Sequence, residues 1–295
     1  MNELRFDSLT KRFDERVVLE NVSGRIQTGI IGVLGTNGAG KTTLIRILAG
    51  LLPPQRGEFL FNGEKLNLES QFWRENIGYL PQSPGLYERM TVGEYLDYML
   101  LLSGWKRRSA RGERIEEVTA NLNLQSYKNT PIGHLSGGTK QRAAIAQAVI
   151  HKPTVLFLDE PTNNLDSEER HRFHDYLLKR ADEGIVLFIG HIVNELAGLC
   201  STLMIVGDEK IQFQGTPAEL IASAQQCVKE VRMQRQEFTD ELKQKLRILN
   251  IAQDGKELLV RFDGRFSDIH GSNHVEPTLE EAYRVFGNSG SNAKQ

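Results

Sequence analysis

The sequence has little of several features that would narrow its function at once. Only two cysteines occur in 295 residues, Cys200 and Cys227, so neither a disulfide framework nor a cysteine-ligated metal cluster is expected. No apolar run approaches the roughly 18 to 20 residues that a membrane helix needs, and no secretory signal is visible. The formal net charge of −2 gives no bulk attraction to nucleic acid. These absences favour a soluble cytosolic enzyme of one large domain or two.

The first informative motif is the segment Gly35 to Thr42, with the sequence Gly-Thr-Asn-Gly-Ala-Gly-Lys-Thr. It follows an apolar, Ile-rich run, residues 29–34, which predicts a strand buried on both faces. Glycines let backbone N–H groups approach an anion, and a helix predicted over residues 42–49 would add its N-terminal donors. Lys41 would then reach the β- and γ-phosphates of a nucleotide. The predicted nucleotide-binding residues are Gly35, Asn37, Gly38, Ala39, Gly40, Lys41, Thr42 and Thr43.

A second apolar run, Val155 to Leu158, ends in the acidic pair Asp159-Glu160. Magnesium bound to phosphates needs further oxygen ligands, and an attacking water needs orientation. Asp159 at the carboxyl end of this predicted strand would face the Mg²⁺, and the Thr42 hydroxyl would also ligate it. Glu160 would act as a general base or orient the water. A solvated acidic turn is the alternative, and the nearby phosphate-binding pattern counts against it.

A third motif, Leu135-Ser-Gly-Gly138, lies between the other two at the start of an alanine-rich predicted helix. The three motifs, in this order and spacing, resemble the nucleotide-binding subunit of an ATP-binding cassette (ABC) transporter over about residues 1–222. In that family the third motif caps the γ-phosphate held by the opposite subunit of a dimer. The resemblance implies that Ser136, Gly137 and Gly138 bind nucleotide, whereas an ordinary serine-glycine helix cap is the alternative.

The same resemblance implies roles for four single residues. Phe13 matches an aromatic that stacks on adenine, with a core position in the N-terminal sheet as the alternative. Gln82 matches a glutamine that senses Mg²⁺ and the γ-phosphate, and His191 a histidine that contacts that phosphate. Asp166 matches the acidic member of a loop that communicates across the dimer, or else it caps the next helix. The implied catalytic residues are Lys41, Gln82, Glu160 and His191, and the implied Mg²⁺ ligands are Thr42, Gln82 and Asp159.

Two positions depart from the family pattern. Thr139 follows the Leu-Ser-Gly-Gly segment where the family most often has Gln, and Gly190 precedes His191 where Ser or Thr is usual. Neither change removes a group assigned to phosphate chemistry. Because Glu160 and His191 are both present, we interpret the site as able to hydrolyse ATP with Mg²⁺.

The expected fold is α/β, a parallel sheet of the P-loop NTPase type flanked by helices. An N-terminal antiparallel β-subdomain, an inserted helical subdomain and a small α+β C-terminal extension complete it. The predicted boundaries are 1–222 for the ATPase domain, 83–150 for its helical insertion and 223–295 for the C-terminal accessory region. Residues 288–295 at the end are expected to be disordered.

Two further segments carry predictions of local structure. The charge-rich residues 105–117 are expected to be solvated. The spacing of apolar residues between Val228 and Leu246 suggests interrupted helical amphipathicity, and residues 257–262 suggest a strand. Thr278 with Glu281 predicts a capped final helix that ends near residue 287.

The resemblance predicts an ATPase subunit at the cytoplasmic face of a membrane, which dimerises as a homodimer or heterodimer around MgATP. Its partners would be transmembrane permease subunits, contacted through Leu86, Tyr87 and Met90, so membrane contact would be indirect and no nucleic acid is expected. The alternative for these three residues is local packing of a loop onto the helical subdomain. Export is favoured because residues 278–283 resemble the closing segment of cassettes in multidrug, antibiotic or polysaccharide exporters.

Two other functions stay open at this point. One is a soluble cassette ATPase that acts on the ribosome or DNA, although this chain has one cassette and no sustained heptads. The other is a P-loop kinase of small molecules, which has no need of the segment Leu135 to Gly138.

Overall fold

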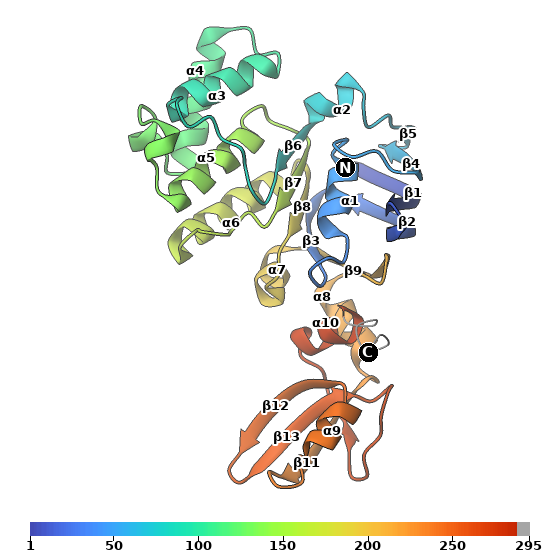
Figure 1. Ribbon diagram of the computed structural model, residues 1–295. Helices are drawn as coiled ribbons and strands as arrows, with labels where there is room; N and C mark the ends of the chain where they lie inside the picture. The colour runs from blue at the N-terminus through green and yellow to red at the C-terminus, as the bar shows by residue number, and fades with distance from the viewer. Residues whose placement is uncertain (288–295) are drawn as a thin grey trace.

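Residues 1–287 are described by the computed structural model, and three sheets with surrounding helices make up this part of the chain (Figure 1). The expected C-terminal disorder at 288–295 falls outside the described residues. The expected α/β fold is confirmed, with an antiparallel sheet near the N-terminus and an α+β region near the C-terminus.

The largest sheet has six strands in the order β10-β9-β3-β8-β7-β6. All neighbouring pairs are parallel except β9 and β10, which are antiparallel. Helices and the second sheet cover its two faces, so alternate residues of β7 enter different cores: Leu156 and Leu158 enter one, Val155 and Phe157 the other. The strands are β3 (Gly29–Leu34), β6 (Ile77–Leu80), β7 (Val155–Asp159), β8 (Ile185–Ile189), β9 (Thr202–Gly207) and β10 (Lys210–Gly215).

The second sheet is antiparallel, with strand order β2-β1-β4-β5. Its apolar side chains share a core with helix α1 and with one face of the large sheet, which fixes it beside the β3–α1 turn. Trp73 on α2 is fully buried in this core and donates its indole N–H to the Leu48 carbonyl, 2.8 Å away. The elements are β1 (Glu3–Phe13), β2 (Arg16–Gln27), α1 (Lys41–Leu48), β4 (Arg56–Phe61), β5 (Glu64–Lys65) and α2 (Gln71–Asn76).

Residues 83–150 are mainly helical, as predicted. Helix α5 packs on the other face of the large sheet together with α6 and α7, and α3 and α4 pack on α5 (Figure 1). The expected solvation of residues 105–117 is wrong in part. Arg111 is buried against Asp97, and Arg114 donates to the carbonyls of Val149 and Ile150, so these cations tie α4 to its neighbours. The helices are α3 (Val92–Leu102), α4 (Arg108–Asn121), η1 (Gln125–Tyr127), η2 (Ile132–His134), α5 (Gly137–Val149), α6 (Ser167–Ala181) and α7 (Val193–Leu199).

The C-terminal region forms a four-stranded antiparallel sheet in the order β12-β13-β11-β14, well separated from the other sheets in Figure 1. The helical amphipathicity expected from Val228 onward is wrong, because the first part is strand β11 with alternating buried residues and only α9 is helical. The elements are α8 (Pro217–Ala224), β11 (Val228–Gln234), α9 (Asp240–Lys245), β12 (Ile248–Asp254), β13 (Glu257–Asp263), β14 (Asn273–His274) and α10 (Leu279–Gly287).

The final helix α10 returns from this sheet to the core beside the large sheet. The Thr278 hydroxyl accepts from Glu281 N and the Glu281 carboxylate accepts from Thr278 N, so the predicted cap is confirmed. Ala282 and Val285 of α10 are buried in the same core as Leu220 of α8. The side chain of Tyr283 reaches the backbone of Gly35, directly after β3.

Candidate functional site

The turn between β3 and α1 forms a narrow loop, which we call the phosphate loop (residues 35–43). Gly35 has a φ of 153°. A Cβ at this position would lie 2.2 Å from the Val206 carbonyl oxygen, so only glycine lets the chain pass β9 so closely. Helix α1 begins at Lys41, one residue before the predicted start, and its first backbone N–H groups therefore face the loop.

Lys41 is folded back onto the phosphate loop. Its ammonium donates to the carbonyl oxygens of Gly35 and Thr36, at 2.8 and 2.9 Å. Desolvation by burial lowers the pKa of Lys41, and the carboxylates of Glu160 and Asp159 partly oppose this shift. The ammonium therefore lies within the loop where an anionic ligand would offer it stronger, charged acceptors.

Asp159 ends β7 beside this loop and is only 1% exposed. Burial raises the pKa of its carboxyl group, while a hydrogen bond from the Thr42 side chain acts in the opposite direction. Its Oδ2 atom is buried and, among the described residues, has no hydrogen-bond partner. A buried carboxylate oxygen without a partner is costly in an apolar setting. The Asp159 carboxylate and the Thr42 hydroxyl are oxygen ligands of the kind that a hard divalent cation prefers.

Glu160 follows immediately and has a φ of 52°, an uncommon backbone conformation for a non-glycine residue. Its backbone N–H donates to the Ile189 carbonyl at 3.1 Å, which fixes the turn after β7. Its Oε2 accepts from the amides of Gln82 at 3.1 Å and Asn163 at 2.7 Å. The structure thus brings Gln82 to Glu160 across the ends of β6 and β7, and it adds Asn163, which sequence reasoning missed.

A pocket of about 300 Å³ adjoins the phosphate loop and extends toward the turn between β1 and β2. Phe13, at the end of β1, is 45% exposed, so its alternative assignment as a core residue is wrong. Sequence reasoning did not identify Arg16 and Val18 as lining residues, because only strand pairing places Arg16 opposite Phe13. The lining residues are Phe13, Arg16, Val18, Gly38, Ala39, Gly40, Lys41, Thr42 and Thr43.

His191 lies just beyond β8, at the edge of the sheet where β3 and β7 also end. Its side chain is exposed, and the preceding Gly190 donates its N–H to the Val33 carbonyl at 3.4 Å. A Cβ on Gly190 would lie 3.3 Å from Leu196 side-chain atoms. Gly190, which stands where the family usually has Ser or Thr, is thus packed tightly against α7.

Residues Ser136, Gly137 and Gly138, which we call the cap, begin helix α5 on the other side of the large sheet from α1 (Figure 1). Within the described part of the chain, they do not line the pocket at the phosphate loop. Ser136 and Gly137 are exposed, and a Cβ on Gly137 would meet nothing within 4 Å. A Cβ on Gly138 would lie 2.8 Å from the Asn164 carbonyl oxygen, so glycine permits a close approach to the next loop.

Both alternatives that assigned helix caps are found in the structure. The Ser136 hydroxyl accepts from Thr139 N at 3.2 Å, and Asp166 caps α6 by accepting from Glu169 N at 2.8 Å. A capping oxygen retains further hydrogen-bonding capacity, so these contacts leave a second role open for both residues.

Comparison with known proteins supplies the context for this geometry. Residues 19–163 match the family model described as ABC transporter. An uncharacterised ABC transporter ATP-binding protein from Bacillus subtilis, YxlF, is 37% identical over 74% of this chain and 72% of its own length. The ABC transporter ATP-binding protein NatA from the same organism is 33% identical over 72% of this chain and 89% of its own.

A solved structure described as the ATP-binding subunit of an ABC transporter superposes with a TM-score of 0.69 at 25% sequence identity. The superposition covers 75% of this chain and 92% of the matched structure's chain. Taken with the phosphate loop and the acidic pair after β7, these matches establish the identity at family level. The chain belongs to the ATP-binding subunits of ABC transporters and is an ATPase.

Proposed function

We propose that two copies of this subunit, or one copy and a related cassette, close head to tail around two MgATP molecules. The observation that carries this proposal is the position of the cap. Its exposed donors lie away from the phosphate loop of their own chain, so a second molecule would be needed to bring such donors to the γ-phosphate. ATP would then bind the closed state more tightly than the open one, which is the condition for driving a conformational cycle.

Binding would rearrange the groups at the phosphate loop. Lys41 would exchange two backbone carbonyls for phosphate oxygens, and the adenine ring would lie in the pocket against Phe13. Thr42 and Asp159 would hold Mg²⁺, with Gln82 as a further ligand. The bound cation supplies charge neutralisation along the phosphates. The unpartnered Oδ2 of Asp159 supports this assignment.

Glu160 is the residue placed to orient or deprotonate the attacking water. Its Oε2 now accepts from two neutral amides, and its Oε1 remains available for another donor. His191 would donate to the phosphoryl oxygens from the neighbouring strand end. Gln82 links Glu160 to the loop that enters the helical insertion, so nucleotide state and helical position would be coupled.

We assign the contact with a permease to the surface around Tyr87, in the segment that follows Gln82. Tyr87 is 54% exposed, and its ring lies 5.8 Å from that of Tyr95 and 6.0 Å from that of Tyr98. Leu86 and Met90 pack against the core of the helical insertion instead, so they would support the surface rather than form it. The exposed rings of Tyr87 and Tyr98, with the buried Tyr95 beside them, suit a protein interface coupled to the nucleotide.

Export is the direction that we propose. The support is the segment 278–283 at the capped start of α10, which resembles the closing segment of exporter cassettes. The names of relatives include both an exporter and an importer. A Nod factor export ATP-binding protein from Burkholderia pseudomallei and an Fe(3+) ions import ATP-binding protein from Escherichia coli are each 32% identical. Among the described residues, no helix is long and apolar enough to span a bilayer.

Co-purification from membranes tests this proposal. The tagged chain is expected to retain an integral membrane protein, and reconstitution of that pair in vesicles should give ATP-dependent movement of solute out of the nucleotide-facing side. Tyr87→Ala should weaken the retention at least tenfold without changing ATP binding, whereas Phe72→Ala, an exposed aromatic on α2, should have no effect. Retention of ribosomes or DNA instead would replace the proposal, as would formation of a phosphorylated small molecule in place of free phosphate.

A further inference from the structure

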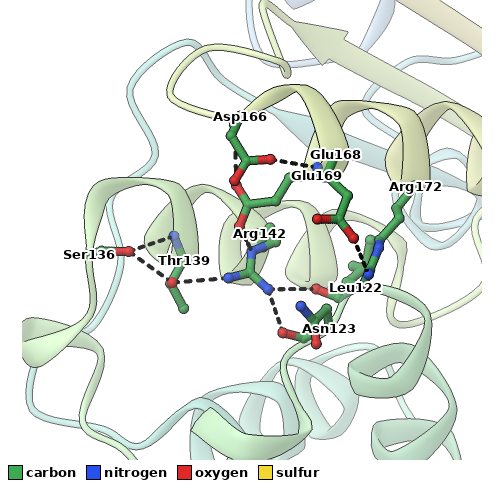
Figure 2. Close-up of polar contacts among 9 residues, drawn as sticks. All are labelled: Leu122, Asn123, Ser136, Thr139, Arg142, Asp166, Glu168, Glu169 and Arg172. Carbon is green, nitrogen blue, oxygen red and sulfur yellow. Dashed lines mark hydrogen bonds and ion pairs between the residues drawn. The ribbon is translucent and has the colours of Figure 1, made fainter.

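Thr139, which departs from the family pattern, joins Ser136 of the cap to a polar network centred on Arg142 (Figure 2). Its side chain is only 4% exposed. Its Oγ1 lies 2.9 Å from the Ser136 hydroxyl oxygen and accepts from Arg142 Nη2 at 3.1 Å. The residue therefore stands between a cap hydroxyl that faces solvent and a buried guanidinium.

Arg142 limits how Thr139 can use its hydroxyl group. A guanidinium only donates, so Thr139 Oγ1 must spend one lone pair on it. The Arg142 Nη1 group donates to the carbonyls of Leu122 and Asn123, which holds the guanidinium in place. Thr139 therefore keeps one hydrogen and one lone pair for Ser136.

The Ser136 hydroxyl can meet a ligand in only one of the two arrangements of this pair. Its oxygen already accepts from the Thr139 backbone N–H at 3.2 Å. When the Thr139 hydroxyl also donates to it, both lone pairs of Ser136 are filled and its single hydrogen is free to point outward. In the opposite arrangement Ser136 donates to Thr139, and no hydrogen remains for a phosphate.

Glutamine at position 139 would act differently. Ser136 is the N-cap of α5 and position 139 is its N3 residue, so serine with glutamine there would form a capping box directed at the backbone N–H of residue 136. The shorter threonine bonds the Ser136 side chain instead. With threonine in place of glutamine, the side chain at position 139 therefore contacts the Ser136 hydroxyl, which would meet the nucleotide, and not the Ser136 backbone N–H.

The network also reaches the loop at Asp166. Arg142 Nε lies 2.9 Å from Glu169 Oε1 and lacks a hydrogen-bond partner, so the contact is an ion pair. The other oxygen of Glu169 accepts from Asp166 N at 3.4 Å. The cap and the N-terminus of α6 are therefore held by one buried cation.

We propose that Thr139 is a positioning residue that turns the Ser136 hydroxyl hydrogen toward the γ-phosphate bound by a second molecule. This role rests on the proposed function, because it requires the cap to meet that phosphate. Thr139 itself touches no nucleotide. Its hydroxyl group accepts from Arg142 and donates to Ser136. A phosphate oxygen accepts a hydrogen bond from Ser136, so the approach of a phosphate selects the arrangement in which the Ser136 hydrogen points outward.

The experiment measures the MgATP concentration for half-maximal dimerisation by light scattering, with the full chain carrying Glu160→Gln to stop hydrolysis. Thr139→Val, which keeps the shape and removes the hydroxyl group, should raise that concentration about tenfold, the effect of one net hydrogen bond. Thr139→Ser should stay within about twofold. Thr119→Val is the matched control, since Thr119 is also buried and its hydroxyl donates only to carbonyls of its own helix α4.

A double-mutant cycle separates positioning from simple support of the fold. In a Ser136→Ala background, Thr139→Val should cause no further loss, because the group through which Thr139 acts is gone. A tenfold loss that persists without the Ser136 hydroxyl would overturn the role, and so would normal dimerisation of Thr139→Val. If the Glu160→Gln parent stays monomeric in saturating MgATP, two copies of this chain do not form the head-to-tail dimer, and the role of Thr139 in such a homodimer falls with it.

Discussion

The phosphate loop and the cap differ in what their polar groups do without a ligand. In the phosphate loop, Lys41 is bound to two backbone carbonyls and one oxygen of Asp159 has no partner. In the cap, Ser136 is tied to Thr139, and Arg142 behind it is held by carbonyls and a carboxylate. The phosphate loop holds backbone contacts that a ligand would replace, whereas the polar groups of the cap are already organised.

This difference indicates how binding would be divided between the halves. The phosphate loop must break existing contacts before it meets phosphate, so part of its interaction energy is spent on exchange. The cap has little to reorganise, so its donors would add affinity mainly through their geometry. Each of the following predictions separates the two halves.

The largest effect is expected from Glu160→Gln. Turnover should fall about thousandfold, within the range of general-base catalysis, because the neutral amide cannot take a proton or attract water as strongly. ATP binding should persist, so the variant separates chemistry from assembly. Steady-state phosphate release measures the change. Glu168→Gln removes an exposed carboxylate on α6 and should leave the rate unchanged; a similar fall there would contradict the assignment.

Lys41→Met should have the next largest effect, and on the phosphate loop alone. ATP affinity should fall about a hundredfold, since two charge-assisted contacts are lost. The cap should remain intact. Mixing this variant with a chain that carries Ser136→Ala should restore one complete site per heterodimer. Equilibrium binding of ATP and light scattering of the mixture measure the two halves separately, and undiminished affinity would refute the role of the lysine.

Tyr283→Phe should have a moderate effect on the same loop. Burial raises the pKa of this tyrosine, and the backbone of Gly35 acts in the opposite direction, so the neutral phenol lies against the loop. Loss of the hydroxyl group should weaken ATP binding about threefold to fivefold, roughly 1 kcal/mol. Tyr98→Phe, in the helical insertion, is the control. Equal binding by both variants would show that α10 does not support the loop.

The smallest effect concerns the other end of the cap helix. His151 follows α5, and its Nε2 bonds the Ile77 carbonyl at the start of β6 at 2.8 Å. Burial lowers the pKa of His151, so below its ordinary value of about 6.5 the unfolded chain binds the proton more readily. Stability from this group is therefore full above pH 6.5 and falls as pH drops toward the native pKa.

Chemical denaturation between pH 7.5 and 5 checks this sign. The loss should approach at most about 1.4 kcal/mol per pH unit, the slope for one proton. His151→Asn retains an amide donor and should show a shallower decline, whereas His134→Asn, at an exposed position before the cap, should follow the parent. Parallel curves for all three chains would remove His151 as the source.

Much of the phosphate loop could be predicted from the sequence, because its contacts are local. The glycines, Lys41 and the strand before them are consecutive, and the apolar runs predicted β3 and β7. Arg16 and Asn163 were missed, since strand pairing places one and a turn the other. The burial of Arg111 and the strand at Val228 were missed for a related reason: charge pairing and sheet pairing are made by partners distant along the chain.

The return of α10 gives the C-terminal sheet two attachments to the ATPase core, a covalent one through α8 and a second one through the packing of α10. A module tethered at one end can swivel, whereas two anchored ends restrict its rotation. The segment between α8 and α10 is in this sense an insertion, and its sheet could be exchanged while both helices stay. A chain shortened at residue 222 would instead uncover Leu220, which is now buried in the same cluster as Ala282 and Val285. Trimming the polypeptide there would damage the enzyme that it was meant to isolate.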